Sequence, residues 1–269
     1  MPISRSFISK WMTRRRSPPG VLEVIPSVHS PELDNSRDIF VYRPASYAKG
    51  TSRYPVIYMH DGQNLFDPET AFAGEWGVDR AIAHAPRKAR RALIVGIPNR
   101  GVERLDEYSP FVDPTRGGGR ADDYIDFIIN TVKPMIDERY RTLADHASTG
   151  IVGSSLGGLL SLYAFFREPA QFGFVGALSP ALWFGHEAIF DWVKDAPLVP
   201  GRIYLDVGTR EGQRTLTHAR AMRDLLVEKG YKRGSTLKWV EDTGGMHNEA
   251  AWGRRFNKAL PFLLGVQQA

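Results

Sequence analysis

A serine set between two glycines is the residue of this chain best suited to chemistry. Ser155 is the centre of the pattern Gly-x-Ser-x-Gly at residues 153–157, after an apolar run and before a helical run. This order is typical of a nucleophile elbow, in which a strand turns so sharply into a helix that the serine side chain projects clear of the sheet. Gly153 and Gly157 leave room for the strained turn. The pattern therefore predicts a nucleophilic serine.

A serine hydroxyl needs a general base, and in folds with such an elbow the chain order is serine, acid, histidine. Three histidines follow the serine: His186, His218 and His247. His218 falls inside a predicted helix, where we expect it to face solvent, and His186 precedes the strand expected to carry the acid. His247 lies in a glycine-rich loop at the carboxyl end of the last predicted strand, where ligands bind in open parallel sheets. We predict that His247 is the base; the alternative is a surface histidine that caps a helix.

The acid that orients this base should follow the strand that ends at Val207. Glu211 lies just past that strand and is long enough to reach the histidine loop, so we predict that it is the triad acid. Asp206 is the alternative, because a strand carboxylate pointing into the core needs a partner. Asp242 and Asp191 are weaker candidates.

Two backbone N–H groups should stabilise the charge that develops on the substrate carbonyl. One is expected from Leu156, the residue after the nucleophile, and the other from Gln63, with an uncertainty of one residue, in the loop that follows the third strand. The neighbouring pair His60 and Asp61 raises the alternative of a metal site. Since no other cluster has ligand spacing and the chain has no cysteine, we expect no metal and no cofactor.

Strands that alternate with helices must position these residues. The predicted strands are 21–28, 37–44, 54–62, 92–98, 148–153, 174–180, 201–208 and 236–241. The predicted helices are 74–84, 121–140, 156–166, 187–194, 215–228 and 248–264. The segment 99–120 reads as a long polar loop. This alternation predicts one α/β domain over residues 21–269, with a mostly parallel sheet of about eight strands and helices on both faces.

Charge is concentrated at the amino terminus. Residues 1–20 form a basic arm with five Lys and Arg and no acid, so the remaining 35 − 5 = 30 basic residues balance the 30 acidic ones. A neutral body argues against nucleic-acid binding. No apolar run reaches a transmembrane length, and the arm lacks the apolar region of a secretory signal. We therefore expect a cytoplasmic protein, and the oligomeric state is left open.

Five blocks resemble a known family when taken together. They are Val-Ile-Tyr-Met-His-Asp-Gly-Gln-Asn-Leu-Phe-Asp at 56–67, Glu-Trp-Gly-Val-Asp at 75–79, Arg-Leu-Asp-Glu-Tyr-Ser-Pro at 104–110, Gly-Ser-Ser-Leu-Gly-Gly at 153–158 and His-Asn-Glu-Ala-Ala-Trp at 247–252. Over residues 36–265 the chain resembles the putative-esterase family of α/β-hydrolases. That family includes esterase D, feruloyl and acetylxylan esterases, and enterochelin esterases, whose branch is the most similar. The absence of cysteine argues against esterase D.

The resemblance implies an α/β-hydrolase fold, Ser155 as nucleophile, His247 as base and an acid at position 211, where many relatives carry Asp. Enterochelin esterases recognise an anionic trilactone, which suggests Arg104, with Arg100 and Arg210, as substrate contacts; alternatively, Arg104 pairs with Glu107 and holds the loop. Exposed aromatic candidates for an acyl or aryl pocket are Trp76, Tyr108, Trp183 and Phe184. Packing in the core is the alternative for each.

These observations together predict a serine carboxylesterase that acts on a small-molecule ester through an acyl-enzyme, with no cofactor and no nucleic-acid partner. An acyltransferase of the same fold is the second enzymatic hypothesis. The third is a non-catalytic binding protein on a hydrolase scaffold, against which the complete set of Ser, His and acid argues.

Overall fold

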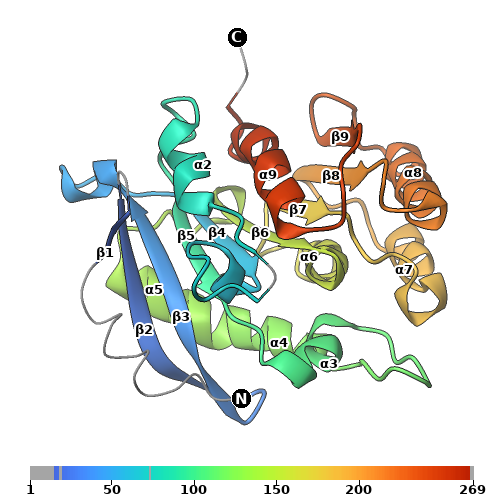
Figure 1. Cartoon of the computed structure of the whole chain (residues 1–269), viewed down its shortest axis with the longest axis horizontal. Helices are drawn as coiled ribbons and strands as arrows, with labels where there is room; N and C mark the ends of the chain where they lie inside the picture. The colour runs from blue at the N-terminus through green and yellow to red at the C-terminus, as the bar shows by residue number, and fades with distance from the viewer. Residues whose placement is uncertain (1–14, 18–19, 73, 267–269) are drawn as a thin grey trace.

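A computed structural model describes residues 15–17, 20–72 and 74–266; most of the basic arm predicted at 1–20 lies outside them. Within these ranges nine strands form one sheet, in the order β1-β2-β3-β5-β4-β6-β7-β8-β9 (Figure 1). The strands are β1 (Arg15–Ser17), β2 (Gly20–Ser30), β3 (Asn35–Pro44), β4 (Val56–His60), β5 (Leu93–Ile97), β6 (Thr149–Ser154), β7 (Phe174–Leu178), β8 (Arg202–Gly208) and β9 (Leu237–Asp242). All eight predicted strands are present, and β1 adds a ninth at the edge.

The sheet has a parallel and an antiparallel part. From β5 to β9 every neighbouring pair is parallel, whereas β1, β2 and β3 pair antiparallel with one another and β3 pairs antiparallel with β5. The central strands β4 and β5 are buried along their whole length, as continuous apolar runs predict. The prediction of a mostly parallel sheet is confirmed.

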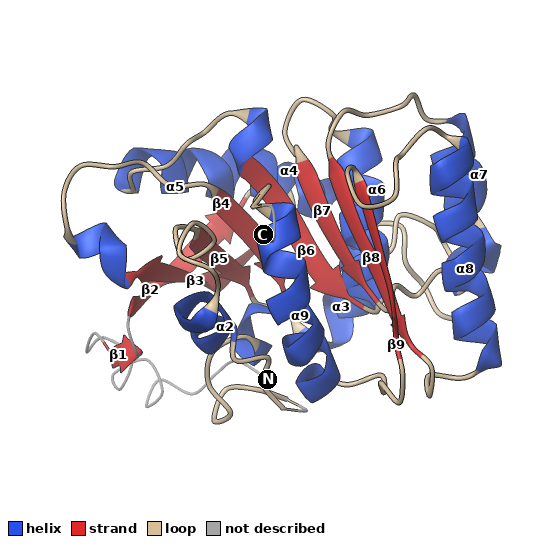
Figure 2. Cartoon of the chain, turned by 90° about the horizontal axis from the view of Figure 1, so that it is seen from above, coloured by secondary structure: helices blue, strands red, loops and turns tan. Residues whose placement is uncertain are grey.

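Helices cover both faces of this sheet (Figure 2). Alternation along β4 shows the two sides, because Val56 and Tyr58 belong to one apolar cluster and Ile57 and Met59 to the other. The second cluster is covered by α2 (Val78–His84) and α9 (Glu249–Leu263). The first is covered by α4 (Ala121–Asp126), η4 (Phe127–Val132), α5 (Lys133–Arg139), α6 (Leu156–Arg167), α7 (Ile189–Asp195) and part of α8 (Gln213–Glu228).

Two features differ from the sequence prediction. The helix predicted at 121–140 contains a π-helical stretch, η4, which ends two residues before Pro134. The ring of this proline lacks the N–H that a regular α-helical hydrogen bond needs. The loop predicted at 99–120 contains a short helix, α3 (Arg104–Tyr108). Five residues make little more than one turn, so α3 must be held by contacts with the rest of the molecule.

Candidate active site

The strand β6 enters α6 through a strained turn at Ser155. This residue has φ 54° and ψ −121°, and its N–H donates a hydrogen bond to Leu178 O at 3.0 Å. A Cβ atom at Gly153 would lie 2.6 Å from the backbone of Gly157 and 2.7 Å from the ring of His60, so no side chain fits there. The backbone therefore has the geometry of the nucleophile elbow that the sequence predicts.

Three loops at the carboxyl ends of β6, β8 and β9 bring the three candidate residues together. The Oγ atom of Ser155 lies 3.0 Å from Nε2 of His247, and Nδ1 of His247 lies 2.9 Å from Oε2 of Glu211. The imidazole is 41% exposed, whereas the glutamate side chain is 0% exposed. One face of the arrangement is thus open to a substrate while the acid is shielded from water.

The second oxygen of Glu211 is held by three donors. Its Oε1 accepts hydrogen bonds from Ser179 Oγ at 2.7 Å, Gly208 N at 2.8 Å and Arg255 Nη2 at 3.0 Å. Burial raises the pKa of Glu211, but the hydrogen bonds from His247 and Ser179 and the charge of Arg255 outweigh it, so the pKa lies below its ordinary value. The carboxyl group is therefore ionised and its free oxygen points to the imidazole.

Asp206, the alternative acid, lies behind this group and has no hydrogen bond to His247 within the described part of the chain. It is fully buried, and its Oδ1 accepts from Ser179 N at 3.0 Å and lies 3.2 Å from Arg255 Nη1. Burial raises its pKa to about 7, despite the nearby guanidinium. Its geometry supports a role in the cluster around Arg255 rather than direct orientation of the base.

Sequence reasoning missed three residues of this cluster. The hydroxyl of Ser179 accepts hydrogen bonds from Trp252 Nε1 at 3.1 Å and Arg255 Nη2 at 2.9 Å while it donates to Glu211. The Trp252 ring also packs edge-on against His247, with centroids 4.9 Å apart. The three residues are Ser179, Trp252 and Arg255. A signal for the last two existed in the sequence, because they are three positions apart on the helix that follows His247 and therefore share one face.

The two N–H groups predicted to bind the oxyanion stand next to Ser155 and on the turn after β4. Leu156 is the first residue of α6, and Gln63 lies in the short helix η2 (Gly62–Asn64). Neither N–H donates a hydrogen bond within the described residues. The carbonyl oxygen of Gln63 accepts a hydrogen bond from Thr70 Oγ1 at 2.7 Å, and its side-chain Oε1 accepts one from Asn99 N at 3.2 Å.

The pair His60 and Asp61 has no geometry for a metal. Burial lowers the pKa of His60 to about 3, so its ring is neutral, and Asp61 is occupied by Arg104 and Asn99. Among the described residues, no group of three or more His, Asp or Glu could hold a metal ion.

Three of the four aromatic residues proposed as substrate contacts are buried, which is the core packing that the sequence left open as the alternative. Tyr108 and Phe184 are fully buried and Trp76 is 7% exposed, so the expectation that they are exposed was wrong. Arg104 forms a two-point ion pair with Asp61, not with Glu107. Of the four aromatic candidates, Trp183 alone is partly exposed, and the guanidinium of Arg116 lies 5.3 Å above its ring.

His218 also differs from expectation. Its side chain is 14% exposed and lies 3.1 Å from Glu187 instead of facing solvent. None of the helices described here is both long enough and apolar enough to cross a bilayer.

Comparison with known proteins shows the family and the fold of the chain. Residues 30–263 match the family described as "Putative esterase". The uncharacterized protein YbbA of Bacillus subtilis is 27% identical over 249 residues, which cover 87% of this chain and 95% of YbbA. The siderophore triacetylfusarinine C esterase of Aspergillus fumigatus is 33% identical over 150 residues, or 52% of this chain and 50% of that protein, so the match spans about half of each.

Among solved structures, the BES protein from Bacillus cereus has a TM-score of 0.72 and 22% identity, covering 90% of this chain and 94% of its own. This likeness shows a shared fold, the α/β-hydrolase fold that the family resemblance implied. The family match covers most of the chain, including every residue of the Ser155 site. The chain therefore belongs to the putative esterase family, whose members are hydrolases that act on esters.

Proposed function

We propose that this protein is a serine carboxylesterase with Ser155 as nucleophile, His247 as general base and Glu211 as the orienting acid. The observation that carries the proposal is the unbroken series of contacts from Ser155 Oγ to His247 Nε2, at 3.0 Å, and from His247 Nδ1 to Glu211 Oε2, at 2.9 Å. In this geometry an ionised carboxylate fixes the tautomer that leaves Nε2 free to accept the serine proton.

In the first half-reaction, Ser155 Oγ attacks the ester carbonyl carbon while its proton passes to His247 Nε2. The carbonyl oxygen becomes an oxyanion, stabilised by the N–H groups of Leu156 and Gln63. The C–O bond to the alcohol then breaks, and the alcohol leaves with the proton from the imidazolium. The product is an acyl-serine.

The second half-reaction reverses these roles with water. A water molecule gives a proton to His247 and attacks the acyl carbon, and the same N–H groups stabilise the oxyanion. The bond from the acyl carbon to Ser155 Oγ then breaks, Ser155 takes the proton back from His247, and the carboxylic acid product leaves. The lowered pKa of Glu211 supports this cycle, because the acid stays ionised beside each imidazolium that forms.

For the natural substrate, the name of the Aspergillus relative leads us to propose a siderophore ester as the first compound to test. The support is the similarity of sequence over 150 residues of the chain. The expected anionic contact through Arg104 is not part of this support, since the Nε and Nη2 edge of that guanidinium is already bound by Asp61.

The test is hydrolysis of p-nitrophenyl esters from acetate to octanoate by the wild type, Ser155→Ala and the matched control Ser154→Ala. Ser154 precedes the nucleophile and is buried in β6. We expect turnover by the wild type and the control, and a loss of at least about 10⁴-fold in kcat for Ser155→Ala. Mass spectrometry of the quenched wild type should detect an acyl adduct on Ser155. Wild-type activity that survives in Ser155→Ala would refute the proposal, and alcohols added as acceptors would reveal acyl transfer.

A further inference from the structure

The turn that carries Gln63 begins in an unfavourable backbone conformation. Asp61 has φ 54° and ψ 45°, in the left-handed region that non-glycine residues seldom adopt. The next residue cannot bear a side chain, because a Cβ atom at Gly62 would lie 2.6 Å from the backbone of Gly96. A turn of this kind keeps its shape only if the surrounding structure holds it.

The short helix α3 supplies much of this support. The Nε and Nη2 atoms of Arg104 donate hydrogen bonds to the two carboxylate oxygens of Asp61, each at 2.8 Å. The hydroxyl oxygen of Tyr108 accepts the N–H of Asp61 at 3.0 Å. Side chain and backbone of the same residue are thus bound by two residues of one helix. Burial raises the pKa of Asp61, but the charge of Arg104 and the hydrogen bonds from Arg104 and Asn99 lower it by more. The pKa therefore lies below its ordinary value, and the pair of Asp61 and Arg104 stays ionised.

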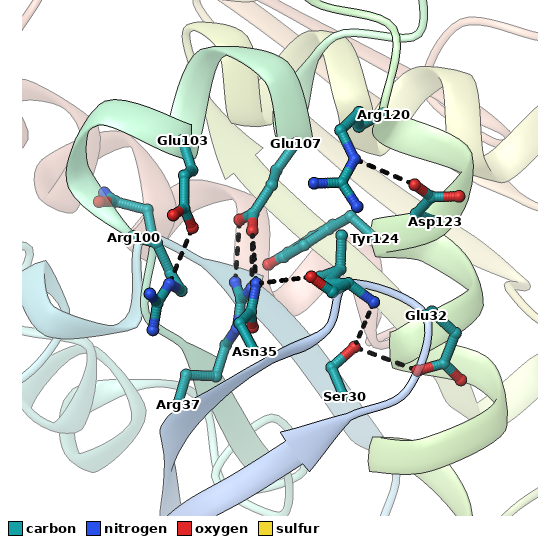
Figure 3. Close-up of polar contacts among 12 residues, drawn as sticks. Ser30, Glu32, Asn35, Arg37, Arg100, Glu103, Glu107, Arg120, Asp123 and Tyr124 are labelled. Atoms are coloured by element: carbon teal, nitrogen blue, oxygen red, sulfur yellow. Dashed lines mark hydrogen bonds and ion pairs between the residues drawn. The ribbon is translucent and has the colours of Figure 1, made fainter.

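The helix α3 is itself fixed from its other side. Glu107 faces Arg37 of β3 through two hydrogen bonds, at 2.7 Å and 3.0 Å (Figure 3). Both side chains are almost fully buried, and the Arg37 guanidinium lies 5.5 Å from the ring of Tyr124. The antiparallel edge of the sheet therefore anchors a helix that would not persist alone, and the helix anchors the turn.

On the basis of the proposed hydrolysis at Ser155, we propose that Arg104 and Tyr108 are positioning residues for the oxyanion-binding N–H of Gln63. They act through Asp61, and they do not touch the substrate. A donor must point at the place where the charge develops, so a small rotation of the turn weakens transition-state binding more than ground-state binding. This role replaces the expected contact of both residues with the substrate.

The experiment compares the wild type with Tyr108→Phe and Arg104→Lys on p-nitrophenyl acetate, which is neutral and offers no anion to Arg104. Tyr108→Phe keeps the buried ring but removes the acceptor, and Arg104→Lys cannot make the two-point pair. We expect kcat to fall about 10-fold in each with KM unchanged, less than the about 10²–10³-fold cost of losing an oxyanion donor. Arg120→Met is the matched control, since Arg120 pairs with Asp123 near the surface at the end of the same loop (Figure 3).

A second readout separates positioning from general damage. Each enzyme is also assayed on the thionoester, O-(p-nitrophenyl) thionoacetate, whose sulfur accepts hydrogen bonds poorly. We expect the wild type and Arg120→Met to prefer the oxygen ester strongly, and the two positioning variants to lose about 10-fold of this preference. Thermal melting checks that each variant is folded.

The outcomes are distinct. A higher KM with unchanged kcat would mean that the residues bind the substrate, and an unchanged oxygen-to-sulfur preference would mean that they only stabilise the fold; either result overturns the inference. A wild type that is inactive on both esters, with no acyl adduct, overturns the proposed function itself.

Discussion

Two arginines support the two sides of the candidate active site, and they do so differently. Arg104, on the oxyanion side, is 26% exposed and meets one carboxylate, that of Asp61, through two parallel hydrogen bonds. Arg255, on the acid side, is 1% exposed and lies between Glu211 and Asp206. Its Nη2 donates to Glu211, but its Nη1, 3.2 Å from Asp206, and its Nε make no aligned hydrogen bond within the described residues.

The difference shows that an arginine lowers the pKa of each carboxyl group beside it, but that one shared arginine does not offset burial at both of its buried neighbours. One arginine for one carboxylate lowers the pKa of Asp61. Arg255 is shared between Glu211 and Asp206, with Asp242 4.0 Å from its Nε, and there burial raises the pKa of Asp206 to about 7 while Glu211 keeps a lowered pKa. The pair of Asp61 and Arg104 thus stays ionised, whereas the acid side is sensitive to pH and to the loss of its cation.

Among the residues that support Ser155 and His247, the largest effect should come from the acid that contacts the base. Glu211→Gln keeps the shape but presents an amide N–H to His247 Nδ1, which favours the wrong tautomer and leaves no acceptor for the serine proton. We expect kcat to fall by roughly 10³–10⁴-fold, measured on p-nitrophenyl acetate. Glu241→Gln, at an exposed ion pair with Arg220, is the control and should change kcat little. Asp206→Asn should lose less than about 10-fold; a loss as large as that of Glu211→Gln would transfer the acid role to Asp206.

Removal of the shared cation should mainly damage the fold. Arg255→Met leaves two buried carboxyl groups without their partner, and we expect the free energy of unfolding to fall by about 3–5 kcal/mol at pH 8. Urea denaturation measures this loss. The control is Arg254→Met, one residue earlier on α9, whose side chain is 63% exposed and 3.7 Å from Asp242; there the change should stay within about 0.5 kcal/mol. Equal losses in both variants would show that the cluster has no special dependence on Arg255.

The chain's local patterns predict the scaffold better than they predict these supports. Continuous apolar runs predict β4 and β5, and the glycines around Ser155 predict the elbow, because each signal lies within a few neighbouring residues. The pairs formed by Arg104 with Asp61 and by Arg37 with Glu107 join residues 43 and 70 positions apart. Only the order of strands in the sheet brings them together, so no local pattern could separate them from the alternative Arg104–Glu107 pair.

The same limit explains why aromatic residues predicted to be exposed are buried. Tyr108 stands beside a proline-containing polar loop, which suggests exposure, but α3 turns its ring against His60 and Tyr124 in the core. The choice between Glu211 and Asp206 was predictable in part, because a residue inside β8 points into packing whereas one in the following loop can reach another loop. The role of Ser179 was not, since its partners come from two other elements.

The raised pKa of Asp206 gives stability a pH dependence of definite sign. A carboxyl whose folded pKa is about 7, above its ordinary value of 3.8, binds its proton more tightly in the folded state. Its contribution to stability is therefore present at low pH and is lost as pH rises toward 7 and above. We expect the stability of the wild type to decline between pH 5 and pH 8 relative to Asp206→Asn, as measured by urea denaturation across that range. A difference that is flat with pH would show that Asp206 is ionised throughout.

The smallest effect should come from the indole that supports Ser179. Trp252→Phe removes the Nε1–H donor, 3.1 Å from Ser179 Oγ, and keeps an aromatic ring beside His247. The hydroxyl of Ser179 still has Arg255 as a donor and Glu211 as an acceptor. We therefore expect the free energy of unfolding to fall by about 1–2 kcal/mol and kcat to change by less than about threefold. Trp192→Phe is the control, because Trp192 is 36% exposed and packs against Tyr163 with its ring tilted. If Trp252→Phe instead lowered kcat as far as Glu211→Gln does, the charge of Arg255 would not be enough to hold Glu211. The orientation of the acid would then depend on the hydrogen bond from Trp252 to Ser179 as well.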